Sequence, residues 1–236
     1  MIAHTVAAPV VGRRLTLSGD DPSYVDLDGF VVVVVGRAGP LLPNGVRLTD
    51  RPSAGPLSLT GATVWDPTLR LPDDPASLGT EILQTLDQPS QRGQTPLLPT
   101  LNQPSQRGQT PLLARAVVER DPSLAAAAGA ELIGLGPGLT PEGDDVVAGV
   151  AAVVASGPWP EALREAWLGA LLGADLRRRT TALSATLLEL AASGMGPEPL
   201  QALVGGRMAA LDRLLRVGHT SGRAYALGAG VALTVV

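Results

Sequence analysis

The chain has 236 residues, of which 45% are hydrophobic and 17% are charged, and its formal net charge is −4. This length allows one large or two small domains, and the composition excludes an intrinsically disordered chain. The chain is acidic and has only three Trp, two Tyr and one Phe, so it would repel phosphate and offers few rings on which bases could stack. We therefore expect no nucleic-acid partner.

Cysteine is absent, which excludes disulfides, a thiolate nucleophile and cysteine-built zinc sites. The opening stretch from Met1 to Leu15 lacks the basic start and the long apolar run of a secretion signal. No apolar run approaches the roughly 20 residues that a membrane span needs. These features predict a cytoplasmic protein with no membrane partner.

Short β-branched runs separated by Gly, Pro and Asp predict β structure in the first part of the chain. The clearest strand is Phe30–Val35, whose six apolar residues without alternation predict a central strand covered on both faces. Weaker candidates are Gly12–Leu17, Val46–Thr49 and Ala62–Trp65. Residues 1–84 are thus predicted to form a small β-sheet or barrel-like domain.

A tandem repeat follows this β-rich segment. Thr85–Leu98 recurs as Thr100–Leu113 with one change, Asp87 to Asn102. Two copies are too few for a solenoid, so we interpret residues 85–113 as a duplicated loop or linker, which surface positions tolerate. The alternative is a partner-binding arm rich in Gln and Pro.

Helical periodicity dominates from residue 114 to the end of the chain. Glu161–Leu176 and Leu200–Val217 repeat apolar residues at spacings of three and four. Val146–Ala155 and Ala224–Val235 are apolar on nearly every side, which predicts buried central helices. The fold class is therefore predicted to be α+β, with an all-helical domain over residues 114–236.

A glycine-rich motif, Gly-Leu-Gly-Pro-Gly-Leu-Thr-Pro-Glu-Gly-Asp-Asp, spans residues 134–145 and leads into the first of these apolar helices. Thr140 is predicted to be the N-cap and Pro141 the first helical residue. Gly136, Gly138 and Gly143 would let a ligand approach the backbone, where free N–H groups and the helix dipole favour negative charge. An ordinary capped helix start has the same features, and that alternative stays open for the glycines and Thr140.

Asp144 and Asp145 strengthen the functional interpretation. Both enter a helix that is otherwise apolar, so at least one carboxylate should be partly buried. A buried carboxylate needs a cation such as Mg²⁺, an arginine or the N–H groups of a ligand. We therefore predict catalytic, ligand-binding or metal-binding roles for this pair.

A second motif, Gly-His-Thr-Ser-Gly at residues 218–222, precedes the other apolar helix. If the two helix starts meet, Thr220, Ser221 and Gly222 would supply donors opposite the two aspartates. His219 is the candidate catalytic base, and the alternative is a capping or packed histidine.

A polar stripe interrupts a leucine-rich segment near residue 180. Thr181 and Ser184 are three residues apart and would share one face of a helix. Arg179 could clamp a carboxylate or phosphate through two hydrogen bonds, the alternative being a solvated arginine run at a helix end. All three are candidate ligand-binding residues.

Taken in order, the three motifs resemble a bacterial family of unknown function that includes the allantoin-utilisation subunit of oxamate carbamoyltransferase. The resemblance covers roughly Leu132–Leu233. It implies a subunit that takes part in carbamoyl transfer between carbamoyl phosphate and oxamate, which gives oxalurate and phosphate, and thus a small anionic or carbamoyl ligand. It also implies two partners, an FdrA-like protein and a second subunit of an uncharacterised family. The alternative is a non-catalytic small-molecule-binding or scaffold subunit.

Overall fold

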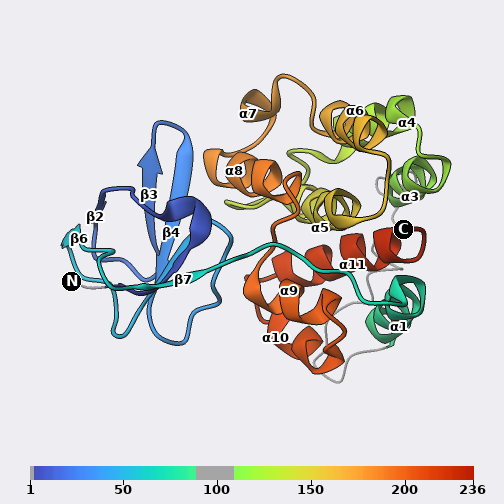
Figure 1. Ribbon diagram of the computed structural model, residues 1–236. Helices are drawn as coiled ribbons and strands as arrows, with labels where there is room; N and C mark the ends of the chain where they lie inside the picture. Colours follow the sequence, from blue (N-terminus) through green and yellow to red (C-terminus); the bar gives the residue numbers. More distant parts are fainter. Residues whose placement is uncertain (1–2, 89–108) are drawn as a thin grey trace.

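The computed structural model describes residues 3–88 and 109–236, in which a β-rich part is followed by helices (Figure 1). The predicted α+β class is thereby confirmed. Most of the predicted repeat segment, residues 85–113, lies outside the described residues. Within the described ranges, none of the helices has the length and apolar character needed to cross a bilayer.

The β-rich part contains a five-stranded sheet with strand order β3-β4-β5-β1-β7. The pairs β3/β4 and β1/β5 are antiparallel, whereas β4/β5 and β1/β7 are parallel. A second, two-stranded antiparallel sheet pairs β2 with β6. The strands are β1 Ala3–Ala7, β2 Leu15–Leu17, β3 Ser23–Leu27, β4 Phe30–Val35, β5 Gly45–Leu48, β6 Gly55–Leu57 and β7 Thr63–Trp65, with a 3-10 turn η1 at Ala8–Val10.

Strand β4 is covered on both faces, as its unbroken apolar run predicted. Val32 and Val34 belong to the core that the sheet shares with β2 and β6. Val31, Val33 and Val35 point to the other face, where they pack with leucines of helix α8. The second face of the sheet therefore rests on the helical part of the chain.

Helices α5 and α11 lie at the centre of the helical part, as their apolar sequences predicted. The two helices cross in close contact at Gly228. A Cβ atom at this position would lie 2.1 Å from the Val146 carbonyl oxygen, so only glycine fits there. The helices are α1 Pro75–Asp87, α3 Gln109–Glu119, α4 Pro122–Leu132, α5 Glu142–Ser156, α6 Glu161–Leu172, α7 Leu176–Arg179, α8 Ala182–Ala191, α9 Glu198–Val204, α10 Leu211–Leu214 and α11 Ser221–Leu233, with a 3-10 turn η2 at Met208–Ala210.

The structure differs from the sequence prediction in two helices. Glu161–Leu176 was expected to be one helical stretch, but α6 ends at Leu172, before Gly173 with its φ of +71°, and Leu176 begins α7.

Leu200–Val217 was expected to form a single helix, but it is divided into α9, η2 and α10. Helix α9 ends before Gly205 and Gly206. Gly206 has a φ of +87°, which is incompatible with a right-handed helix. Leu203 and Leu211 still point into the same core, which explains the continuous apolar period.

Helix α1 packs on α11 and not on the sheet (Figure 1). A Cβ atom at Gly79 would lie 2.7 Å from the Gly230 carbonyl oxygen, and the Arg223 guanidinium donates to the Leu86 carbonyl at 2.8 Å. The division into domains at residues 84 and 113 stays a prediction.

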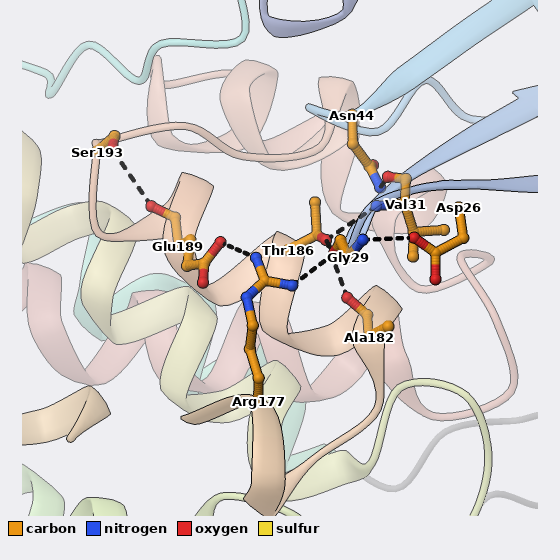
Figure 2. Close-up of polar contacts among 9 residues, drawn as sticks. All are labelled: Asp26, Gly29, Val31, Asn44, Arg177, Ala182, Thr186, Glu189 and Ser193. Carbon is orange, nitrogen blue, oxygen red and sulfur yellow. Dashed lines mark hydrogen bonds and ion pairs between the residues drawn. The ribbon is translucent and has the colours of Figure 1, made fainter. Parts of the chain in front are cut away.

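Polar contacts dock the β3–β4 hairpin on α7 and α8 (Figure 2). The Thr186 hydroxyl accepts a hydrogen bond from the Val31 N–H at 3.1 Å and lies 3.2 Å from the Gly29 carbonyl oxygen. The Arg177 guanidinium donates to the same Gly29 carbonyl and forms an ion pair with Glu189 at 2.5 Å. These contacts fix the sheet against the helices. A cavity lies between the sheet and the helices.

Candidate functional site

A cavity of about 410 Å³ lies between the five-stranded sheet and the helices. Its walls are largely apolar, with Val33 and Val35 from β4 facing Leu183 and Leu187 from α8. Its volume falls within the range of small-molecule sites, roughly 300–1,000 Å³. We call this space the Asp145 cavity, after the acid at its polar end.

The polar end of the cavity is formed where α5 and α11 begin. Thr140, Asp145, Ser221 and Tyr225 all line it. The hydroxyl oxygens of Thr140 and Ser221 lie 3.0 Å apart and share a hydrogen bond. The glycine-rich motif and the Gly-His-Thr-Ser-Gly motif therefore meet at one position.

Asp145 is 1% exposed, and its Oδ2 atom has no hydrogen-bond partner in the described part of the chain. Burial raises its pKa from 3.8 to about 8, and the nearby charges of Asp144 and Glu142 add to the increase. The hydroxyls of Ser221 and Thr140 offset part of this pKa increase. At neutral pH the side chain is therefore mainly a protonated carboxyl group, with one donor and one acceptor side by side.

Tyr225 lies beside this acid and is 3% exposed. Burial raises its pKa well above 10, and the charges of Asp145 and Asp144 act in the same direction. The phenol thus remains protonated at neutral pH. The cavity lining therefore offers hydroxyl groups and a neutral acid.

Asp144 is also buried but has a different environment. Its Oδ1 accepts a hydrogen bond from the Gly134 N–H at 2.6 Å. Its Oδ2 accepts hydrogen bonds from the Ser184 hydroxyl at 2.5 Å and from the Thr180 hydroxyl. This carboxyl group ties the glycine-rich loop to α8, and it does not line the Asp145 cavity.

The two aspartates were also predicted to hold a metal ion such as Mg²⁺. Residues 3–88 and 109–236 contain no group of three or more His, Asp or Glu side chains that could bind one. Both Asp144 oxygens accept hydrogen bonds from protein donors, and of the two acids only Asp145 lines the cavity. The metal site stays a prediction.

Thr140 was expected to cap α5, and this prediction is wrong. Pro141 is the N-cap, no side chain caps the helix, and Glu142 is the first helical residue. The Thr140 hydroxyl instead bonds to Ser221. The Thr140 hydroxyl therefore connects the start of α5 to the start of α11 and does not cap the N–H groups of α5.

Thr181 and Ser184 position the glycine-rich loop without lining the cavity. Thr181 is the N-cap of α8, where its hydroxyl accepts from the Ser184 N–H at 3.1 Å. The same hydroxyl donates to the Leu139 carbonyl at 2.5 Å. The predicted polar stripe therefore orients the loop that carries Thr140.

The glycines that were predicted to bind a ligand shape the backbone and do not line the cavity; they are Gly136, Gly138, Gly143 and Gly222. Gly136 and Gly138 have positive φ angles, which residues with a side chain rarely adopt. A Cβ atom would lie 2.1 Å from the Leu132 carbonyl oxygen at Gly143, and 1.7 Å from the Leu214 carbonyl oxygen at Gly222. Close backbone packing explains the latter two glycines.

Three predicted site residues lie elsewhere. The Arg179 guanidinium donates to the carbonyls of Leu172 and Gly129, near the ends of α6 and α4. His219 and Thr220 are exposed, and Thr220 occupies the N-cap of α11 without a side-chain cap bond. The structure does not bring these three side chains into the Asp145 cavity.

Sequence reasoning missed the residues that the sheet contributes to the cavity. Tyr24 of β3 lines it together with Val33 and Val35. The signal for the valines was present in the unbroken apolar run of β4, which required a cover on both faces. Nothing in the sequence indicated that a helix of the second half supplies this cover.

Comparison with known proteins found no match among curated proteins and none among solved structures. A family model does match, over residues 132–233. This segment contains Thr140, Asp144, Asp145 and Ser221, and it coincides with the stretch in which the resemblance was predicted. The segment 132–233 is thus identified as matching the family described as oxamate carbamoyltransferase subunit AllH.

Proposed function

We propose that the chain is a subunit of a carbamoyltransferase of the oxamate type and that the Asp145 cavity binds the carbamoyl group of its ligand. The observation that carries the proposal is a buried acid with a raised pKa and an unpartnered oxygen, at the polar end of a cavity of small-molecule size. The family match over residues 132–233 supports the class of reaction.

A protonated carboxyl group is complementary to a primary amide. Its O–H donates to the amide carbonyl, and its carbonyl oxygen accepts from the amide NH₂. Oxamate carries such an amide beside a carboxylate. A neutral Asp145 would bind the amide without repelling the carboxylate.

The carboxylate of the ligand would accept hydrogen bonds at the N-termini of α5 and α11. The hydroxyls of Thr140 and Ser221 lie there, and the positive ends of the α5 and α11 dipoles favour anionic oxygen. Donors fixed in this way also stabilise charge that develops on oxygen during acyl transfer.

Carbamoyl transfer itself is proposed to require partners, since the matched family is described as a subunit. We propose an FdrA-like protein and a second subunit of an uncharacterised family. The test is the formation of oxalurate from carbamoyl phosphate and oxamate. We expect a mixture of the chain with both partners to catalyse this reaction. We expect no oxalurate from the chain alone.

The binding proposal is tested by calorimetric titration of the full chain with oxamate, and with oxalate as a ligand that lacks the NH₂ group. We expect oxamate to bind more tightly than oxalate. Asp145→Asn keeps one donor and one acceptor and should retain oxamate binding, whereas Asp145→Leu should abolish it. Asp73→Asn, at an exposed position, is the matched control and should leave binding unchanged.

Two results would contradict the binding proposal. Equal affinities for oxamate and oxalate would exclude recognition of the amide. Unchanged oxamate binding in Asp145→Leu would place the ligand elsewhere. If oxamate fails to bind at all, a scaffold role becomes the better interpretation of the same residues.

A further inference from the structure

Four arginines surround a second cavity, separate from the Asp145 cavity. Arg37, Arg47, Arg213 and Arg216 line a space of about 410 Å³. Arg37 and Arg47 also line an adjoining space of about 490 Å³. We call these joined spaces the arginine hollow. Such a gathering of cations is notable in a chain whose net charge is −4.

Positive charge is in excess in the arginine hollow. Glu198 forms an ion pair with Arg47 and lies 3.5 Å from Arg213. Within residues 3–88 and 109–236, the guanidinium groups of Arg37 and Arg216 have no hydrogen-bond or ion-pair partner, and no acidic side chain lines the hollow. Of the four guanidinium groups, two therefore share one carboxylate and two have none among the described residues.

One arginine of this group, Arg47, is held in place. Arg47 donates from Nε to the Gly39 carbonyl at 3.1 Å, and its side chain is only 21% exposed. A guanidinium group fixed on one side presents its remaining N–H donors in a planar fork, which matches phosphate or carboxylate oxygens. Ordering this side chain on binding would therefore require little loss of entropy.

We propose that the arginine hollow binds a small dianion with clustered oxygens, either a phosphate group or a short dicarboxylate. Arg37 and Arg216 would contact the oxygens directly, and Arg47 would orient them. Gly39, Pro40 and Val217 line both this hollow and the Asp145 cavity, so the dianion would lie next to the carbamoyl site. This proposal depends on the four arginines and not on Asp145, so it does not require that the Asp145 cavity binds a carbamoyl group.

The test is calorimetric titration of the full chain with inorganic phosphate and, separately, with malonate. Sodium chloride is exchanged for the titrant so that the ionic strength stays constant and general screening cannot produce a signal. We expect saturable binding, and the tighter of the two ligands identifies phosphate or dicarboxylate as the preferred class. Absence of saturable binding of both ligands overturns the proposal.

The double variant R37Q/R216Q should weaken binding about tenfold or more, since each lost contact is a charge-assisted hydrogen bond. Arg178→Gln removes an exposed arginine of α7 and should change the affinity less than about twofold, because long-range effects of exposed charges are screened. Equal affinities of the double variant and Arg178→Gln overturn the proposal.

Glu198→Gln tests the hollow in the opposite direction. Loss of this carboxylate frees Arg47 and Arg213, so phosphate should bind more tightly than to the unmodified chain. A variant that merely misfolds cannot give tighter binding. Unchanged or weaker binding by Glu198→Gln contradicts the proposal.

Discussion

A buried carboxyl group persists only when donors compensate its charge or a proton removes it, and Asp144 and Asp145 show one solution each. Asp144 accepts from the Gly134 N–H and from the hydroxyls of Thr180 and Ser184. Asp145 has no comparable set of donors, and burial raises its pKa to about 8. Adjacent acids in one motif are thus accommodated in two different ways.

Asp145 should make the stability of the protein depend on pH. Its folded-state pKa is about 8 and its ordinary pKa is 3.8, so the folded protein binds the extra proton between these values. The free energy of unfolding should therefore fall as pH rises through this range, by about 4 kcal/mol between pH 5 and pH 8. Urea unfolding at several pH values measures this.

Asp145→Asn supplies the control, because an amide carries no charge at any of these pH values. The difference in stability between the variant and the unmodified protein should grow with pH and level off above pH 8. Parallel pH profiles of the two proteins would show that Asp145 does not titrate as described.

Asp144→Ala should destabilise the fold by about 3 kcal/mol or more, because the buried Ser184 hydroxyl, the Thr180 hydroxyl and the Gly134 N–H lose their common acceptor. The exposed substitution Asp73→Ala should stay within about 0.5 kcal/mol of the unmodified protein. Urea unfolding at pH 7 compares the two. A small effect of Asp144→Ala would contradict its structural role.

At the scale of elements, the crossing of α5 and α11 positions the site, because each helix begins at the polar end of the cavity. The crossing depends on glycines at the contact. A Cβ atom at Gly149 would lie 2.4 Å from the Tyr225 carbonyl oxygen, and Gly228 makes the reciprocal approach to Val146. Tyr225 is held at the cavity by the same contact.

Gly228→Ala should therefore destabilise the protein by about 3 kcal/mol, since its methyl group overlaps a backbone oxygen that cannot move alone. Gly169→Ala, in α6, meets nothing within 4 Å and should stabilise by about 0.5–1 kcal/mol through the entropy of the unfolded chain. Chemical denaturation of both variants checks the contrast. Equal effects would mean that the two helices do not cross closely.

Elements with long, uniform patterns were predictable from the sequence. The limits of β4 match its apolar run, and α5 and α11 are buried as their composition indicated. The weaker candidates overlap the short strands β2, β5 and β7. Strands β3 and β6 were not predicted, because β3 mixes Asp with apolar residues and β6 consists of Gly, Pro and Leu. The break after α9 was missed, since the apolar period continues across Gly205 and Gly206.

At the scale of the whole molecule, the Asp145 cavity exists because the sheet docks on α8. The motifs led to Thr140, Asp145 and Ser221, since hydroxyl groups and a carboxyl group stand at the starts of two apolar helices. The sheet wall was not predictable, because nothing in the sequence links Val33 to Leu183 of α8. The same limit applies to Arg179, whose carbonyl partners become neighbours only after α4 and α6 pack.

Thr186→Val should loosen this docking. The variant keeps the volume of the side chain but leaves the buried Val31 N–H without an acceptor, which should lower stability by about 1–3 kcal/mol. Oxamate affinity should fall as well, because the sheet forms one wall of the cavity. Thr80→Val is the control, since its hydroxyl bonds only within α1.

The result for Thr186→Val is read from urea unfolding and from calorimetric titration of the same sample. Normal stability together with normal oxamate affinity would show that the hydrogen bond to Val31 does not hold the sheet in place.

Recognition of an amide by a neutral Asp145 is tested most directly by the affinity of the full chain for oxamate as a function of pH. The dissociation constant should stay level up to about pH 8 and then rise about tenfold for each further pH unit, as the acid loses the proton that it donates. Asp145→Asn should show a level dissociation constant throughout. A level profile for the unmodified chain up to about pH 10 would show that oxamate binding does not need the proton of Asp145.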